Sequence, residues 1–334
     1  MNIGLFTSVY FNNIGNGFID VGAEATIKSA KPQNAEVIKV SQCANFAASL
    51  GYAFLLKENR FVNKVWELTM KKFSRSLHDK TYKSVNNNNV FSIADMSIFD
   101  YFIIPGCVLT VPFFSIYGAL LEKKVEQGAK LIFLGASGNY YTDYEIEYVS
   151  KWLKKLNPYA LMFRDSIAFK AYGAFSSNVY NGIDNVFFVN RIGLPRIQTE
   201  KTPYVVFNFE KSENDSIQKE LECSIKDRNI IYSNHKPFPY SKIIRLVKQN
   251  IMISDDPMDY LFLYRHVSET FSDRVHACIP TLSFGNAARL YSDSPRVALF
   301  ENVGLQNITK ELVRIEDLDS MQEKQISFLR DLLK

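Results

Sequence analysis

The sequence predicts an α/β protein built from two Rossmann-like domains that face a cleft. Short apolar runs alternate with longer amphipathic runs along most of the chain, which is typical of mostly parallel sheets covered by helices. The alternation stops near residue 192 and begins again at residue 204. At 334 residues the chain also exceeds the size at which one core keeps growing. We therefore expect domains at 1–192 and 203–310, and a C-terminal helix within 311–334 that returns toward the first domain.

The first domain is expected to contain six strands and four helices, assigned from the period and length of each apolar run. The uncharged stretch 101–121 is interpreted as a buried strand, a turn at Pro105-Gly106 and a helix starting near Val111, rather than as a membrane span. The predicted strands are Ile3–Val9, Glu36–Lys39, Tyr101–Ile104, Lys130–Leu134, Ala160–Arg164 and Asn185–Val189. The predicted helices are Ala23–Ala30, Phe61–Ser76, Phe114–Gln127 and Glu145–Leu156.

The second domain repeats this alternation, so a cleft is expected between the carboxyl ends of two sheets, where open α/β sheets bind ligands. The final helix, Leu318–Leu333, has apolar residues spaced along one face, which must be buried. Strands are predicted at Tyr204–Phe209, Asn229–Ser233, Ile251–Ser254 and Glu269–Asp273. Helices are predicted at Ser216–Lys226, Lys242–Gln249, Pro257–His266 and Val275–Phe284.

Charge and composition exclude some classes of function. The net charge is only +4 and no long basic block occurs, so the chain carries no signature of nucleic-acid binding. The first residues begin a strand without a signal peptide, and we expect a cytoplasmic protein, either free or peripheral at the inner face of the membrane. The basic and aromatic segment 57–73 could contact anionic headgroups, although a solvated helix face is the simpler interpretation. The four histidines lack metal-ligand spacing, so no bound metal is expected.

The most informative motif places Arg274 and His276 two residues apart, at the start of an apolar run. An arginine that keeps its charge beside an imidazole that can lose it suits a site that holds an anion and moves a proton. The predicted position, between a strand and the N-terminus of a helix, also favours an anion. In the plainer alternative, Arg274 pairs with Asp273 or Asp293, and His276 is a histidine near the core.

Two further arginines are candidates for the same site. Arg164 is at the carboxyl end of a predicted strand and would face the cleft, unless it forms a local ion pair with Asp165 or Glu147. Arg296 is expected to open another short strand, and it either faces the cleft or lies exposed at a strand edge.

The N-terminal segment offers weaker signals. Gly15-Asn16-Gly17 is interpreted as a tight turn after the first strand, which could bring backbone N–H groups close to a ligand. Asp20 either binds a hydroxyl of the ligand or caps a helix beginning near Ala23, and capping is the preferred interpretation.

Five segments together, in this order and across residues 3 to 305, resemble the polysaccharide pyruvyl transferase family. Some positions depart from the family pattern: Gly106 stands where two or three glycines are common, Asp20 falls two residues late, and Arg296 replaces a lysine. The resemblance implies a fold similar to two-domain B-type glycosyltransferases. The segments are Asn13–Ala23, Asp100–Gly106, Phe163–Ser166, Ser272–Pro280 and Ser294–Val297.

The resemblance implies transfer of the enolpyruvyl unit of phosphoenolpyruvate onto two hydroxyls of a sugar, giving a pyruvate ketal. Phosphoenolpyruvate would be a co-substrate, with no other cofactor, and the acceptor would be a sugar or lipid-linked oligosaccharide of exopolysaccharide or capsule biosynthesis. Two alternatives stay open: a B-type glycosyltransferase using a nucleotide sugar, and a non-catalytic glycan-binding relative. The expected donor-binding residues are Arg164, Arg274, His276 and Arg296, the first three of them catalytic. The expected acceptor-binding residues are Asn16, Gly17, Asp20 and Gly106.

Overall fold

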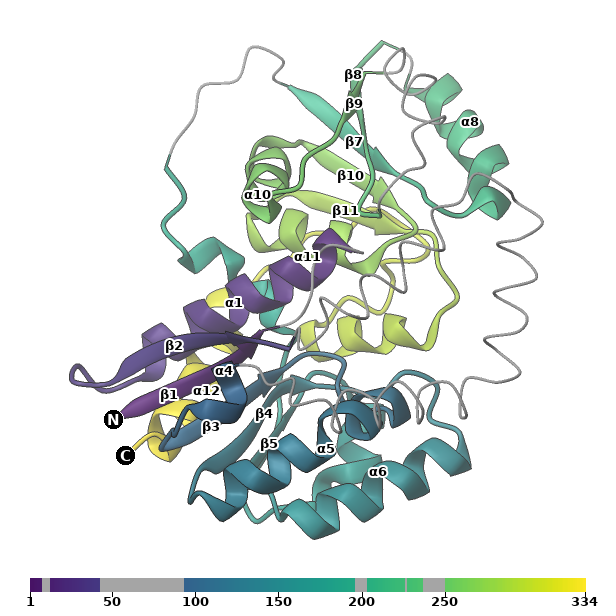
Figure 1. The fold of residues 1–334 in the computed structure, drawn as a ribbon. Helices are drawn as coiled ribbons and strands as arrows, with labels where there is room; N and C mark the ends of the chain where they lie inside the picture. The colour runs from purple at the N-terminus through teal and green to yellow at the C-terminus, as the bar shows by residue number, and fades with distance from the viewer. Residues whose placement is uncertain (8–12, 43–92, 196–202, 226, 237–249) are drawn as a thin grey trace.

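A computed structural model describes residues 1–7, 13–42, 93–195, 203–225, 227–236 and 250–334 (Figure 1). The described strands form two sheets, one of six strands in the order β2-β1-β3-β4-β5-β6 and one of five in the order β11-β10-β7-β8-β9. Every strand pair within these described sheets is parallel. Helices lie outside and between the two sheets (Figure 1). The predicted fold class, α/β with two Rossmann-like halves, is therefore confirmed.

The four central strands of the first sheet are buried over most of their length, as expected for parallel strands covered on both faces, whereas the two edge strands are mostly exposed or half-buried. One predicted strand is wrong. Residues 185–189 belong to a 3-10 helix, η3 (Asn185–Arg191), and the edge of the sheet is the unpredicted β6 (Val179–Asn181). A short apolar run that is buried on all sides does not reveal whether it is strand or helix. The remaining strands are β1 (Asn2–Thr7), β2 (Glu36–Ser41), β3 (Tyr101–Pro105), β4 (Lys130–Ala136) and β5 (Ala160–Phe163).

Helices α5 (Val111–Glu126) and α6 (Asp143–Leu156) cover the outer face of this sheet (Figure 1). The interpretation of residues 101–121 as strand, turn and helix is confirmed, because β3 ends at Pro105 and Thr110 caps α5. No described helix is long and apolar enough to cross a membrane. The predicted helix Phe61–Ser76 and the basic segment 57–73 lie outside the described residues. The other helices are α1 (Ile14–Ala30), α4 (Ile93–Met96), α7 (Ser166–Tyr172) and η2 (Gly173–Phe175).

The second sheet agrees with the predicted alternation and adds β11 (Ala287–Leu290), which was not predicted. The strand expected at Arg296 is wrong, since this residue lies in the 3-10 helix η6 (Pro295–Val303). The predicted helix Lys242–Gln249 lies outside the described residues. The remaining strands are β7 (Tyr204–Asn208), β8 (Asn229–Ser233), β9 (Ile251–Met252) and β10 (Glu269–Ser272). The helices are η4 (Ser212–Asn214), α8 (Asp215–Ser224), α10 (Pro257–His266) and α11 (Val275–Ser283).

The C-terminal helix α12 (Leu318–Leu332) packs against α1 and η3. Its apolar face is buried at Ile326, Leu329 and Leu332, as its spacing predicts. The Tyr101 hydroxyl of β3 also donates a 2.9 Å hydrogen bond to the backbone oxygen of Leu332. The domain boundaries at 192 and 203 stay a prediction, because residues 196–202 lie outside the described part.

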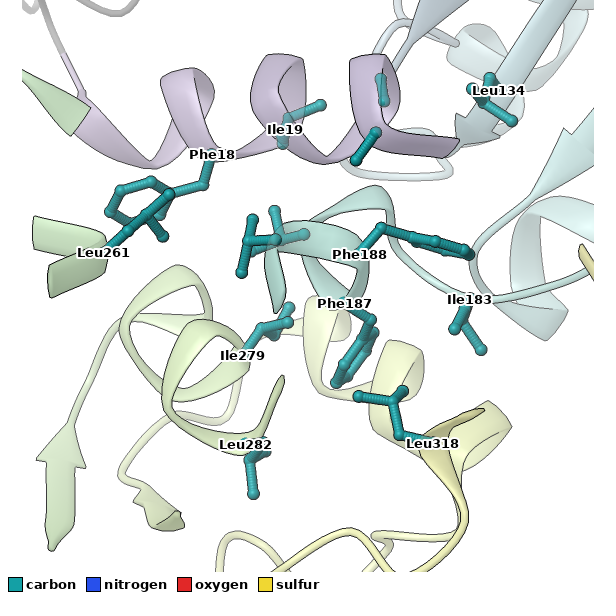
Figure 2. Packing of buried hydrophobic residues seen from close by; sticks show 14 of the residues in the cluster. Phe18, Ile19, Leu134, Ile183, Phe187, Phe188, Leu261, Ile279, Leu282 and Leu318 are labelled. Atoms are coloured by element: carbon teal, nitrogen blue, oxygen red, sulfur yellow. The ribbon is translucent and has the colours of Figure 1, made fainter. Parts of the chain in front are cut away.

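Helix α1 joins the two halves. One hydrophobic cluster includes Ile103 of the first sheet, Val206 of the second and residues of α1 and η3. Figure 2 shows Phe187 and Phe188 of η3 between α1 and α11. The approach of α1 to η3 needs a glycine, because a β-carbon on Gly22 would lie 1.9 Å from the backbone oxygen of Asn185. This packing directs the N-terminus of α1 toward the carboxyl ends of the second sheet.

Candidate functional site

The first turn of α1 lies where the two halves meet, and its geometry corrects the N-terminal expectations. The helix begins at Ile14, with Asn13 as its cap, so Gly15-Asn16-Gly17 is the first helical turn and not a separate turn. Asp20 is buried in mid-helix and does not cap it. The error arose because Gly15 and Gly17 are poor helix formers, and the contact that favours glycine at position 15 comes from the second half.

The first N–H groups of α1 are already bonded. Ile14 N donates to the His235 backbone oxygen at 2.9 Å, which links the two halves. Gly15 N donates to the Asn13 side chain at 3.1 Å, and Asn16 N to the Asn13 backbone oxygen at 3.0 Å. These three amides therefore have no free hydrogen to offer a ligand, and the predicted backbone role of this segment loses its support.

Gly106, the fourth expected acceptor-binding residue, lies at the end of β3 with a φ of +87°. A β-carbon there would lie 3.0 Å from Ile19 of α1, so both the backbone conformation and the packing favour glycine. The backbone conformation and the packing therefore account for a glycine at position 106 without any contact to a ligand.

Arg274 and His276 enter the site at the junction of β10 and α11, as predicted. The Ser272 hydroxyl accepts a 2.8 Å hydrogen bond from Arg274 N, and α11 begins at the next residue. His276 lies in the first turn of α11, and a β-carbon on Gly15 would lie 2.9 Å from its Cβ and Nδ1. Residues far apart in the chain, Gly15 and His276, are therefore in direct contact.

Arg274 does not pair with Asp273 or Asp293. The Asp273 carboxylate accepts hydrogen bonds from the backbone of Glu210 and Lys211 and from Asn214. Arg274 Nε instead lies 3.4 Å from Oε2 of Glu210, a buried carboxylate.

Within the described part of the chain, the two terminal nitrogens of Arg274 have no partner and remain available for an anion. The Glu210 carboxylate is shared, since Lys236 Nζ lies 3.5 Å from Oε2 and His235 N donates to Oε1 at 2.8 Å. Two cations therefore share the Glu210 carboxylate, and the Asp273 carboxylate, which accepts from Glu210 N, brings a second negative charge close to them.

Arg164 does not face the cleft as predicted. Its side chain is 2% exposed, and Nη1 lies 2.6 Å from Oδ2 of Asp184, which is 1% exposed. Its expected local partners are also engaged elsewhere: Asp165 caps α7, and Glu147 pairs with Lys151. Asp184, the residue just before η3, is the partner that the sequence did not reveal.

The buried pair has a defined charge state. Burial by itself would raise the pKa of Asp184, but Arg164 and then His276 outweigh it and hold that pKa well below its usual range. The carboxylate is therefore ionised, and it neutralises much of the charge of Arg164. For this reason Arg164 acts on a ligand in the cleft only at long range.

His276 lies beside this pair, with Nε2 3.7 Å from Oδ2 of Asp184. Burial lowers the pKa of His276, Asp184 opposes that effect, and Arg164 and Arg296 add to it. The imidazole is thus neutral near pH 7 until a ligand brings negative charge. Its position and charge fit a group that takes up a proton when an anion binds.

Arg296 bridges the two halves from η6. Its Nη2 donates a 2.9 Å hydrogen bond to Oδ1 of Asn139, in the loop after β4. The side chain is exposed, and within the described residues no carboxylate pairs with it. The structure thus brings His276, Arg274 and Arg296 to the junction of the two halves, with Arg164 behind them. Among the described residues no three His, Cys, Asp or Glu side chains are arranged to hold a metal ion.

No family model and no curated protein matches the sequence. The structure is similar to several solved ones. S. aureus MnaA with UDP has a TM-score of 0.50 at 9% identity, over 99% of this chain and 91% of that one. A Listeria monocytogenes protein described as a UDP-N-acetylglucosamine 2-epimerase has a TM-score of 0.52 at 10% identity, over 100% and 90%. The Neisseria meningitidis UDP-GlcNAc 2-epimerase bound to UDP-GlcNAc has a TM-score of 0.50 at 12% identity, over 98% and 89%.

These similarities extend over nearly the whole chain, and at such low identity they show the fold alone. The chain has the two-domain architecture of B-type glycosyltransferases. In this architecture ligands bind between the carboxyl ends of the two sheets, which is where His276, Arg274 and Arg296 lie.

Proposed function

We propose that this protein transfers the enolpyruvyl unit of phosphoenolpyruvate onto two hydroxyls of a sugar, and so forms a pyruvate ketal in a cell-surface polysaccharide or its precursor. The observation that carries the proposal is the start of α11. There Arg274 keeps two terminal nitrogens that pair with no described residue, next to a largely buried imidazole that can change its charge. The order of the five sequence segments that resemble pyruvyl transferases supports the same reading.

The charge of the site supports a small, highly charged donor. Phosphoenolpyruvate carries a carboxylate and a phosphate, about −3 in total near pH 7. Arg274 offers a planar fork to one of these groups. Arg296, whose partner among the described residues is the neutral Asn139, can reach an anion by exchanging that hydrogen bond. Arg164 adds long-range stabilisation only, since Asp184 already occupies it.

The reaction needs an acid at the methylene carbon of the donor. The first acceptor hydroxyl attacks the adjacent carbon while that methylene gains a proton, and phosphate leaves as the second hydroxyl closes the ring. His276 is the proposed acid, because an imidazole can hold or release a proton near neutrality. The cations would stabilise the departing phosphate.

A second candidate function is an enzyme acting on a nucleotide sugar. The observation that favours it is the whole-chain similarity to structures solved with UDP or UDP-GlcNAc. In that case Arg274 and Lys236 would hold a diphosphate. A glycan-binding protein without catalysis is the third candidate, and it would need no acid at position 276.

A ligand-protection experiment separates the three. Thermal unfolding would be followed with phosphoenolpyruvate, UDP, GDP or no ligand, on the wild type and on Arg274→Ala. Stabilisation by phosphoenolpyruvate alone, lost in Arg274→Ala, supports pyruvyl transfer, and stabilisation by UDP or GDP alone supports the second candidate. Mass spectrometry of sugars incubated with phosphoenolpyruvate then tests for the added ketal. Binding of sugars without any ketal or phosphate release would favour the third candidate.

A further inference from the structure

The two ring nitrogens of His276 have different surroundings. Nε2 is buried, has no hydrogen-bond partner among the residues that the structure describes, and lies 3.7 Å from the Asp184 carboxylate. Nδ1 lies toward Gly15, whose β-carbon would approach it to 2.9 Å, and it is not among the buried atoms that lack a hydrogen-bond partner. With Nε2 enclosed beside Asp184, Nδ1 is the ring nitrogen left to exchange a proton with a ligand.

The Asp184 carboxylate is held in place by two other groups. Its Oδ1 accepts a 2.8 Å hydrogen bond from Val186 N at the start of η3, and its Oδ2 accepts one of 2.6 Å from Nη1 of Arg164. A carboxylate bonded through both oxygens does not rotate freely. Oδ2, the oxygen that accepts from Arg164, is also the oxygen 3.7 Å from Nε2 of His276.

We propose that Asp184 is a positioning residue that keeps a proton on Nε2 of His276 and so leaves Nδ1 to exchange protons with the ligand. A carboxylate beside an imidazole selects the tautomer whose N–H points toward it, because that N–H makes a charge-assisted hydrogen bond. The present separation exceeds a hydrogen bond by about 0.5 Å, and such contacts commonly tighten when substrate binds. The catalytic consequence rests on the proposed function, whereas the tautomer itself does not.

Among the charged groups around His276, Asp184 is the one that favours its protonated form. The groups that face His276 are Arg164 from the end of β5, Arg296 from η6, His235 from the end of β8, and Asp184. Burial and the two arginines disfavour the imidazolium ion, and Asp184 favours it. Without the carboxylate, the ring would have no anionic neighbour among these groups.

The proton count closes with this arrangement. The imidazolium ion carries hydrogens on both nitrogens, and the Nδ1–H bond breaks as the new C–H bond forms at the donor methylene. The ring is left neutral, with its hydrogen on Nε2 beside Asp184. The hydrogen of the attacking sugar hydroxyl returns to Nδ1, and the hydrogen of the second hydroxyl leaves with the phosphate that this hydroxyl displaces, so the ring ends the cycle in the charge state in which it began.

The test is nuclear magnetic resonance of the protein without substrate, labelled with nitrogen-15 in the histidine rings. Long-range proton–nitrogen spectra distinguish the two neutral tautomers, and the signal absent from His276→Gln assigns residue 276 among the four histidines. We expect the Nε2–H tautomer in the wild type. We expect a mixture of tautomers and a lower pKa for His276 in Asp184→Asn. An Nδ1–H tautomer in the wild type, or a spectrum unchanged in Asp184→Asn, would overturn the proposal.

Asp184→Asn can unfold the protein, because it leaves the buried Arg164 without a counter-charge. The double variant Arg164→Met/Asp184→Asn removes both charges and should show the same loss of tautomer preference in a folded protein. Arg164→Met alone keeps the carboxylate and should retain the Nε2–H form. Loss of that form in Arg164→Met, with the fold intact, would assign the tautomer to the arginine and contradict our proposal.

Kinetics with phosphoenolpyruvate then link the tautomer to turnover. In the double variant, kcat should fall about 10²-fold or more, the alkaline limb of its pH profile should move to lower pH, and KM for phosphoenolpyruvate should change little. An unaltered pH profile would leave Asp184 with a structural role only. If the wild type does not turn over phosphoenolpyruvate at all, the proposed function fails, and the spectroscopic result still decides the role of Asp184.

Discussion

A β-carbon on Gly15 would lie 2.9 Å from both Cβ and Nδ1 of His276. This contact joins the first turn of a helix in one half to the first turn of a helix in the other. It explains why a glycine occupies a helical position at which it is intrinsically unfavourable, and it defines the space beside Nδ1.

Gly15→Ala should therefore lower activity more than it lowers stability. Overpacking costs about 1–3 kcal/mol, and the better helix propensity of alanine returns about 1 kcal/mol, so the net loss of stability should be small. Displacement of His276 should lower turnover at least 10-fold, measured alongside the melting temperature. Gly173→Ala is the matched control, because a β-carbon there meets only ordinary contacts at 3.7 Å or more. Full activity in a folded Gly15→Ala protein would show that the contact is dispensable.

Substitutions of His276 and Arg274 should affect different steps: proton transfer for His276 and donor binding for Arg274. His276→Gln keeps a hydrogen-bond donor without a proton to deliver, and it should slow the chemical step ~10²–10⁴-fold, with donor affinity changed much less. Arg274→Ala should weaken phosphoenolpyruvate binding strongly and affect the chemical step less. Single-turnover kinetics and donor titration measure the two effects. A near-normal chemical step in His276→Gln would remove this residue from the acid role.

Because the Arg164–Asp184 pair is buried, removal of one partner should destabilise the protein. Arg164→Ala leaves the Asp184 carboxylate buried without its partner and should cost about 3–5 kcal/mol in urea unfolding. Lys151→Ala is the control, since it breaks an exposed pair with Glu147 and should leave the unfolding midpoint within error. Equal effects of the two substitutions would contradict the burial described for Arg164.

Two buried histidines should make stability depend on pH. Burial lowers the pKa of both His235 and His276 below the usual 6.5, so between the folded and unfolded pKa values the unfolded chain binds more protons. Stability should therefore fall as the pH drops below about 6.5, by up to about 1.4 kcal/mol per pH unit for each imidazole. Urea unfolding at pH 7.5 and pH 5.5 measures the difference, and the double variant His235→Gln/His276→Gln should reduce it. Because the pKa of Asp184 is lowered, its carboxylate is protonated only at still lower pH, and that protonation removes further stability.

The fold was largely predictable because parallel strands in this chain are short, apolar and separated by amphipathic helices. Helix α10 was predicted at the residues it occupies, and α12 to within one residue. The errors fall where the local pattern does not distinguish strand from helix: residues 186–189 form a short apolar run that fits either, and β11 contains an arginine that masks its strand character.

The site was predictable only in part. Arg274 and His276 stood out because their spacing is local, at the start of one helix. Their partners did not, because Asp184 and Glu210 reach them from elements distant in sequence, as Asn139 reaches Arg296. The same limit explains why Arg164 was placed in the cleft: the residue after a strand can point to either side, and a partner twenty residues later decides which.

The hydrophobic cluster that includes Ile103, α1 and Val206 also predicts how separate fragments of the chain should behave. Each half supplies apolar surface that the other covers, so neither should be a stable protein when produced alone. Two fragments, one ending at residue 195 and one beginning at residue 203, should reassemble when mixed, and their dissociation constant would measure the strength of this shared core. A protease cut between them should leave a nicked protein that melts in one transition.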